Sequence, residues 1–178
     1  MKVCVRQFNV YFALAAALAL LCGCQTEKHD EKVSVLRVHL EVNADNAGDM
    51  STAQTVSVLR SDSVTVTIAR DPILTEANVV AARVIDVNGG FAVEIRFDET
   101  ATWVLEQNTA DNPGRHLVVF GQWGDKLTDG RWLAAPLITH RIGNGMLSFT
   151  ADCSRDEADR LVLGLNNVAK KNLKALLK

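Results

Sequence analysis

The sequence predicts an α+β domain, in which a mostly antiparallel sheet carries two helices packed on it and extra strands precede this unit. Three observations support this fold class. Several short segments alternate apolar and polar residues with period two, which is typical of half-buried strands. A glycine-rich turn at 88–90 joins two of these segments, as expected for a hairpin. Two other segments have helical periodicity and begin with capping residues.

Composition limits both the size and the partners of this protein. The chain has 178 residues, which is enough for one compact domain with a usable core. Its formal net charge is −2, and no basic stripe of the kind that phosphate binding requires is present. We therefore expect no nucleic-acid partner.

The first 23 residues are predicted to be a signal peptide and not part of the fold. Lys2 and Arg6 give a basic start without acidic residues, and residues 10–22 form an apolar run. This run is too short to span a membrane comfortably, because a spanning helix needs about 20 apolar residues. We expect an exported protein.

The apolar run ends within Leu21-Cys22-Gly23-Cys24, and this stretch resembles the lipobox of bacterial lipoproteins. Leu21-Cys22-Gly23-Cys24 has the leucine, two small residues and cysteine of that motif, although Cys22 stands where Ala, Ser or Thr is usual. The resemblance implies that the Cys24 thiol carries diacylglycerol, that cleavage occurs before Cys24, and that the new amine is acylated. The acyl chains of these groups would hold the protein on a lipid bilayer. The alternatives are a secreted protein that is cut nearby and an uncleaved anchor helix.

Cleavage before Cys24 changes the charge of what remains. The mature chain would have 155 residues, with 17 basic and 21 acidic side chains. Residues 24–32 are charged and nearly free of apolar residues, so we predict a solvated tether there and a single domain at 33–178. His29 lies in the tether, and we interpret it as solvent-exposed and not as a metal ligand.

The folded part begins with three predicted strands. Residues 36–42 alternate, which places His39 on the polar face of its strand. Segments 55–60 and 63–69 follow as two strands joined by a short turn, and Pro72 breaks the pattern after them.

The middle of the chain predicts a hairpin, a helix and a buried strand. Asn88-Gly89-Gly90 accept positive φ at little cost and suit the hairpin turn, while Asp98 can cap the helix. The run HLVVF is apolar from Leu117 to Phe120, which suggests a central strand covered on both faces. The predicted elements are strands 79–86 and 91–97, the helix from about 99 to 108, and strand 116–120.

The last third predicts two further extended segments and a closing helix. We expect a long loop at 121–130, an extended segment at 132–138, and a strand at 146–150 after a glycine-rich turn. Ser154 and Glu157 have the spacing of a capping box at the start of the final helix. Lysines at its end complement the helix dipole, and we prefer a solvated face to a lipid contact for them.

The order of these elements resembles the head part of the large first periplasmic domain of SecD, the accessory subunit of the bacterial Sec protein-translocation machinery. The resemblance covers residues 73–168 and includes the segments ILTEANVVAARV and MLSFTADCSRDEADRLVLGLNNV. The matching motifs are Leu74-Thr75, Thr109 to Gly114, Ala135-Pro136, Ile142 to Gly145, Phe149-Thr150 and Glu157-Ala158.

The departures from SecD limit what the resemblance implies. SecD has several membrane-spanning helices that couple proton movement to translocation, whereas this chain has no second apolar run near the roughly 20 residues of a span. The loop at 121–130 is longer than the family's turn, and the strands before Pro72 lie outside the match. The resemblance therefore implies the fold and contact with extended or unfolded polypeptide, without a catalytic residue.

Residues with reactive side chains form no catalytic pattern in the sequence. Cys153 would be the one thiol left after cleavage and lipidation, and the helix that follows it could favour a thiolate. Neither His116 nor His140 lies next to it in sequence, so we interpret it as a packed or inert thiol. Asp125 and Asp129 supply too few ligands for Ca²⁺. We predict no enzyme, no cofactor and no metal.

Trp123 and Trp132 are the candidate partner contacts. If both are exposed, they form an aromatic rim that could capture a peptide beside an unpaired strand. If they face each other across a hairpin, they set its register, which is the commoner arrangement.

Two function classes follow from these observations. The first is a lipid-anchored, non-catalytic envelope protein that binds another protein or an exported polypeptide. Gln25 replaces the Asp that retains some lipoproteins at the inner membrane, so we expect the outer membrane with the domain facing the periplasm; the inner membrane and the cell surface are alternatives. The second class is a small-ligand carrier or enzyme with a pocket near Cys153 and His140.

Overall fold

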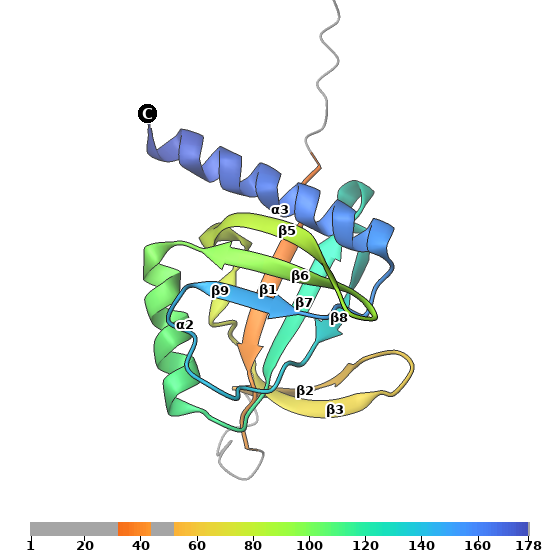
Figure 1. Cartoon of the computed structure of the whole chain (residues 1–178), viewed down its shortest axis with the longest axis vertical. Coiled ribbons are helices and arrows are strands. Elements are labelled where there is room, and N and C mark those ends of the chain that lie inside the picture. Colours follow the sequence, from red (N-terminus) through yellow and green to blue (C-terminus); the bar gives the residue numbers. More distant parts are fainter. Residues whose placement is uncertain (1–31, 44–51, 178) are drawn as a thin grey trace, which may run out of the picture. The chain divides into compact units, whose positions relative to one another are not determined.

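The computed structural model describes residues 32–43 and 52–177, and this part of the chain forms three antiparallel sheets and two long helices (Figure 1). The predicted signal peptide at 1–23, nearly all of the predicted tether, Cys24 and His29 lie outside the described residues. Within the described ranges, no helix has both the length and the apolar character that crossing a membrane requires.

The elements follow one another along the chain in an order close to that predicted. They are β1 (Val35–Leu40), β2 (Ala53–Val58), β3 (Val64–Ala69), β4 (Leu74–Thr75), the 3₁₀ turn η2 (Glu76–Asn78), β5 (Val79–Val87), β6 (Gly90–Phe97), α2 (Glu99–Asp111), β7 (Leu117–Trp123), the 3₁₀ turn η3 (Asp125–Leu127), β8 (Asp129–Ala134), β9 (Met146–Phe149) and α3 (Arg155–Leu176).

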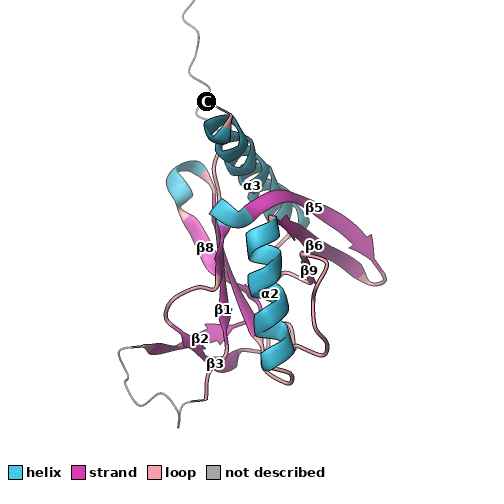
Figure 2. Cartoon of the chain, turned by 90° about the vertical axis from the view of Figure 1, so that its left-hand side faces the viewer, coloured by secondary structure: helices cyan, strands magenta, loops and turns pink. Residues whose placement is uncertain are grey.

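The strands divide into three sheets, where the sequence analysis expected one. Sheet A has the order β4-β1-β7-β8, sheet B is the β2–β3 hairpin, and sheet C has the order β5-β6-β9. The main core lies between sheets A and C, and α2 and α3 close two sides of it (Figure 2). Its members come from both sheets and both helices, so the two sheets are held together by shared apolar burial and not by backbone pairing.

β7 has apolar neighbours on both faces, which confirms the prediction of a covered central strand. Leu117 and Val119 belong to the main core, whereas Val118 points to the opposite face of sheet A. There it forms a second apolar cluster with Val66 and Ile68 of the β2–β3 hairpin. This hairpin therefore covers the outer face of sheet A.

Local capping at both helices is as predicted. The Asp98 carboxylate accepts a hydrogen bond of 2.8 Å from the Ala101 amide at the start of α2. At the start of α3, the Ser154 amide donates to Glu157 Oε2 at 2.7 Å and the Glu157 amide donates to Ser154 Oγ at 3.3 Å. The hydrogen bond from the Ser154 amide is the main cause of the lowered pKa of Glu157, so the capping carboxylate is ionised at neutral pH.

Half of the predicted loop at 121–130 is strand. β7 continues to Trp123 and β8 starts at Asp129, and these two residues are paired across the hairpin. The connection between β7 and β8 is therefore short and consists of residues 124–128, which include η3. Gly124, Lys126 and Leu127 in it have positive φ. Within the extended segment predicted at 132–138, β8 ends at Ala134 before Pro136, which has no amide to donate, but Leu137 still forms an antiparallel bridge with His116.

The prediction for His39 is wrong. The side chain was expected on a polar face, but it is 2% exposed, because the β2–β3 hairpin covers that face of β1. Its Nδ1 lies 2.8 Å from the Ala69 carbonyl, to which it donates. Burial lowers the pKa of His39 despite this hydrogen bond, so the ring is neutral at pH 7.

β1 was expected among the extra strands that precede the main unit, but it lies inside sheet A. It pairs with β4 on one side and with β7 on the other, and Leu36 and Val38 are fully buried in the main core. The strand is therefore part of the central framework of the domain.

Candidate functional site

Trp123 does not lie on an accessible rim, contrary to the prediction. Its side chain is 1% exposed and belongs to the main core. The guanidinium of Arg131 lies 5.1 Å from the centroid of its ring and also binds Glu157 at the start of α3. Trp123 therefore connects sheet A to α3 and has no surface to offer to a partner.

Trp132 lies on the opposite face of sheet A from Trp123. Its ring packs edge-on against His39 and Phe120, with centroid distances of 5.3 and 5.2 Å. Strand pairing places Trp132 opposite Phe120 and Trp123 opposite Asp129, so the two tryptophans do not face each other either. Both predicted arrangements of the pair are wrong. An exposed rim is absent because Trp123 is buried. The two side chains do not face each other because Phe120, the partner of Trp132, is three residues from Trp123, and side chains alternate between faces along a strand.

The exposed tryptophan among the described residues is Trp103, which the sequence analysis did not single out. It is 61% exposed, because α2 buries Ala101, Leu105 and Thr109 on the opposite side of the helix. The spacing of these buried residues was the signal that could have identified it.

Cys153 and His140 do not share a pocket. Cys153 packs partly buried against the main core, whereas His140 is exposed on the segment between β8 and β9. Burial, together with the charge of Glu157, raises the pKa of the Cys153 thiol to about 11. The expectation that the following helix favours a thiolate is therefore wrong for this thiol. Within residues 32–43 and 52–177, no group of His, Cys, Asp and Glu is arranged to hold a metal ion.

This protonated state predicts slow alkylation of Cys153. At pH 8, we expect iodoacetamide to modify the native thiol about 100-fold more slowly than in the urea-unfolded protein, since two pKa units reduce the thiolate fraction by that factor. Mass spectrometry of the mature protein over time gives both rates. The native rate should keep rising with pH up to about 11, whereas a native rate that levels off near pH 9 would contradict this assignment.

The outer edge of β9 is the feature that the sequence analysis did not identify. The Phe97 amide donates to the Gly145 carbonyl at 2.9 Å, and this bond sets the phase of the β6–β9 pairing. Bonded residues alternate along an antiparallel pair. The odd-numbered residues of β9 therefore bond to β6, and the even-numbered residues direct their backbone groups outward.

Two residues of β9 face outward in this way. The Met146 amide is occupied by the Asn144 side chain, whose Oδ1 accepts at 3.1 Å. The amide and carbonyl of Ser148 have no hydrogen-bond partner among the described residues. Ser148 therefore presents one backbone donor and one acceptor that an added strand could use.

Backbone groups on two other strand edges are occupied at one residue each. The Ala82 amide and carbonyl in β5 both bind the side-chain amide of Asn166 in α3, each at 2.9 Å. The Leu133 carbonyl in β8 accepts from the Asp152 amide at 2.8 Å. The amide and carbonyl of Ser148 differ from these groups in having no partner among the described residues.

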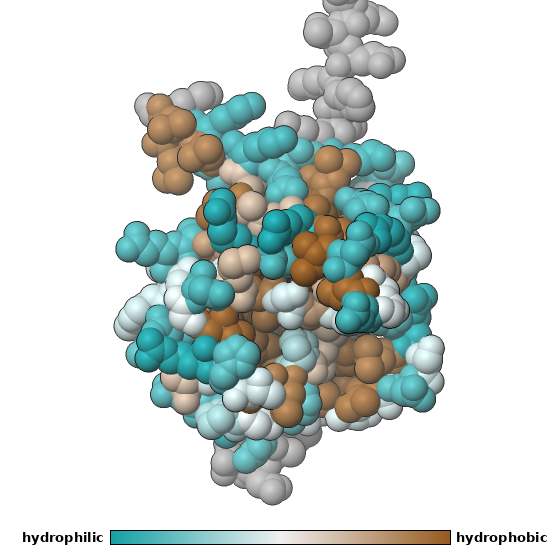
Figure 3. Space-filling view, viewed as in Figure 1, coloured by the Kyte–Doolittle hydropathy of each residue, from teal (hydrophilic) through white to brown (hydrophobic). Residues whose placement is uncertain are grey.

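Two hollows flank this open edge, and we call them together the β9 groove. One, of about 560 Å³, lies between β9 and the segment 136–144. The other, of about 720 Å³, is lined by apolar residues that include Leu59, Val87 and Phe149. Both hollows share Pro136 and Ser148, so the unpaired backbone lies where they meet. The space-filling view shows apolar side chains among polar ones on this face (Figure 3).

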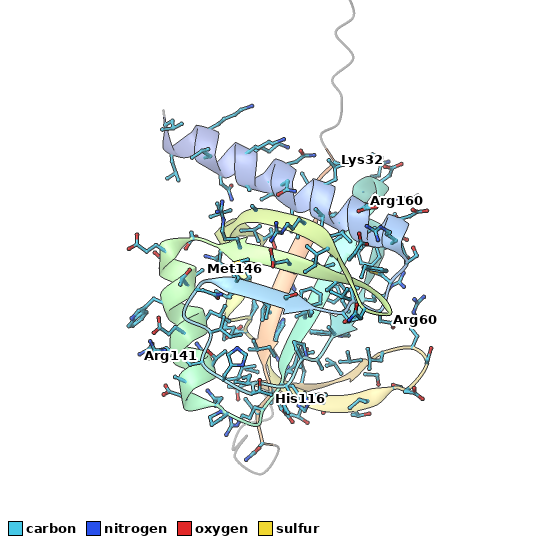
Figure 4. The ribbon with its side chains drawn as sticks, viewed as in Figure 1. Lys32, Arg60, His116, Arg141, Met146 and Arg160 are labelled. Carbon is cyan, nitrogen blue, oxygen red and sulfur yellow. The ribbon has the colours of Figure 1, made fainter. Side chains whose placement is uncertain are left out.

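The wall opposite β9 is held in place by its own contacts. The Ile142 amide donates to the buried Thr109 hydroxyl at 2.9 Å, and Arg141 forms an ion pair with Glu106 of α2. Figure 4 shows Arg141 on this wall and Met146 at the start of β9. Gly145 ends the wall with φ +67°, and a Cβ there would lie 2.1 Å from Thr102 Oγ1. The groove is therefore formed before any ligand arrives.

One protein-family model matches most of the chain. The family model for the SecDF P1 head subdomain matches residues 30–169. The match begins well before residue 73, where the sequence-based resemblance started, and so includes the strands before Pro72. Their inclusion agrees with the position of β1 inside sheet A.

Comparison with solved structures supports the same fold. One structure, of a membrane component SecDF that enhances protein export, has a TM-score of 0.51 and 20% identity over 77% of this chain and 64% of that chain. A second, of SecDF in a super-membrane-facing form, has a TM-score of 0.51 and 19% identity over 77% of this chain and 19% of that chain. This chain thus spans less than two thirds of either relative. Comparison with the curated proteins found no match.

Proposed function

This chain belongs to the SecDF P1 head subdomain family, and from that premise we propose that it is a lipid-anchored, non-catalytic protein of the cell envelope that binds extended polypeptide. The solved relative is described as enhancing protein export, so an exported chain that has not yet folded is the polypeptide class we propose as its partner.

The open backbone of Ser148 carries this proposal. An extended peptide could add to β9 as a fourth strand of sheet C, with its backbone bonded to the Ser148 amide and carbonyl. Alternate side chains of the peptide would then enter the two hollows of the β9 groove. Backbone bonding does not depend on the sequence of the peptide, which suits a protein that handles many exported chains.

The proposed location follows from the lipobox resemblance. Acylated Cys24 would hold the chain on a lipid bilayer, and Gln25 favours the outer membrane with the domain in the periplasm. The position of Cys153 disfavours the alternative of an enzyme or carrier, because its protonated thiol lies apart from His140.

Replacing Ser148 by proline is expected to weaken polypeptide binding about tenfold, because it removes one backbone donor and places the proline ring on the open edge. The probe is fluorescent, reduced and carboxymethylated α-lactalbumin, which stays unfolded. Fluorescence anisotropy with the mature lipoprotein in detergent measures the affinity. The pairing with β6 should persist, since the Ser148 amide faces away from it.

The matched control is Ser148→Ala, which keeps the backbone amide and should bind as the original protein does. Thermal unfolding of both variants shows whether the fold is intact. If Ser148→Pro unfolds normally and still binds the probe with unchanged affinity, strand addition at β9 is not the mode of binding.

A further inference from the structure

The C-terminal end of α3 extends past the domain that the helix covers. The buried residues of α3 are Ala158, Leu161, Gly164 and Leu165, all in the first half of the helix. Asn172 still donates to the Ala77 carbonyl at 3.3 Å, and the end of the helix projects outward (Figure 1). Leu173, Leu176 and Leu177 on this end are 60%, 84% and 79% exposed. Figure 3 shows an apolar cluster at the projecting end of the helix.

The charge of this end differs from that of the whole chain. From Arg160 to Leu177 the sequence contains no Asp or Glu, although acidic residues outnumber basic ones in the chain as a whole. Lys170 and Lys174 are exposed beside the leucines. Lys170, Leu173 and Leu176 help to line a hollow of about 410 Å³. Among its lining residues, Asp98 is the acidic one, and its carboxylate caps α2. Exposed leucines bordered by lysines match the surface of an anionic bilayer.

Lys32, the last residue of the predicted tether, contacts the same helix. The Lys32 carbonyl accepts a hydrogen bond of 2.9 Å from the Asn167 side chain, and Lys32 lies beside α3 in Figure 4. Asn167 is ten residues from Leu177, which is about 15 Å along the helix axis. The eight Cα–Cα steps from Cys24 to Lys32 can span at most about 28 Å. A bilayer that holds Cys24 is therefore within reach of the end of α3.

We propose that residues 170–177 of α3 rest on the anionic bilayer to which Cys24 is attached, with the leucines at the acyl boundary and the lysines at the phosphates. This inference rests on the proposed lipid anchor, which makes a weak second contact effective by keeping it close to the lipid. A cluster of three leucines is small for a stable protein interface, which buries about 800 Å² on each partner.

Such a contact would orient the domain on the membrane. α3 packs on β5, and β9 lies at the opposite edge of sheet C. Figure 1 shows the outer edge of β9 turned away from α3. With the end of α3 on lipid, the β9 groove would face away from the bilayer and toward incoming polypeptide.

The test places p-benzoylphenylalanine at Leu176 of the full-length lipoprotein, with Leu163 as the matched position. Leu163 is 51% exposed on the same helix but lies over the domain. In vesicles of phosphatidylglycerol and phosphatidylethanolamine, we expect at least about tenfold more lipid adducts at position 176 than at 163. Replacing both Lys170 and Lys174 by Gln should lower the adducts at 176 on the order of tenfold, and vesicles of phosphatidylcholine alone should do the same.

Three results would overturn the proposal: equal lipid adducts at both positions, adducts at 176 to a second copy of the chain, or no lipid adduct at 176. Failure of the anchor itself is distinguished by flotation and intact mass. A protein that neither floats with vesicles nor carries acyl mass refutes the anchor, whereas a floating, acylated protein without adducts at 176 refutes the helix contact alone.

Discussion

Replacing Cys24 by serine is expected to abolish lipidation and to leave a precursor that retains its first 23 residues. A serine hydroxyl does not replace the thiol that the lipobox resemblance requires, so cleavage before residue 24 should fail as well. Each buried methylene of an acyl chain contributes about 0.8 kcal/mol to membrane binding, so losing all chains removes nearly the whole anchor. Intact mass and incorporation of labelled palmitate measure both effects.

The matched control is Cys22→Ser, which changes the other cysteine of the same motif. Serine is a usual residue at that position of the lipobox, so processing and acylation should proceed normally. Mature-sized protein in the membrane fraction of the Cys24→Ser variant would refute the anchor. A variant that is cut nearby and secreted would support an ordinary signal peptide instead.

Replacing Gly164 by valine is expected to lower the stability of the domain by about 3 kcal/mol. Gly164 lies where α3 passes closest to the chain before β1, and a Cβ there would be 2.1 Å from Ser34 Oγ and 2.7 Å from the Ser34 amide nitrogen. The hydroxyl can rotate away, but the backbone nitrogen cannot, so α3 must move off sheet A. That movement would separate Leu161 and Leu165 from the main core.

Thermal unfolding measures this effect, and for a domain of this size the change in Tm should be about 10 °C. Gly90→Val is the matched control, because a Cβ at Gly90 meets no atom within 4 Å and its backbone lies outside the positive-φ region. Valine is also favoured in strands, so this control should unfold at an unchanged or slightly higher temperature. Equal Tm values for the two variants would show that the close approach at Gly164 is not required.

Prediction from the sequence succeeded where neighbouring residues decide the outcome. The Asp98 cap, the Ser154–Glu157 capping box and the β5–β6 hairpin all depend on residues a few positions apart, and each is present as predicted. The fold class follows from the same local signals, because alternating and helical periodicities identify each element separately.

Prediction failed where a residue's surroundings come from distant parts of the chain. The alternation in β1 identified the strand, but His39 is buried by Ala69 and Trp132, which follow it by 30 and 93 positions. The tryptophans were assigned from their spacing, whereas their burial depends on α3 for Trp123 and on the β2–β3 hairpin for Trp132. No pattern within either segment contains this information.

By itself, the sequence determined the number, type and caps of most elements and the covered strand β7, because short-range hydrogen bonds and periodic burial are encoded locally. Only the tertiary structure decided that β1 lies inside sheet A, that α3 approaches Ser34 at Gly164, and that β9 has an open edge. The open edge depends on which strand pairs with β6 and on which side the next strand is missing. Pairing between strands far apart in sequence sets both, and the candidate site is therefore a property of the folded domain alone.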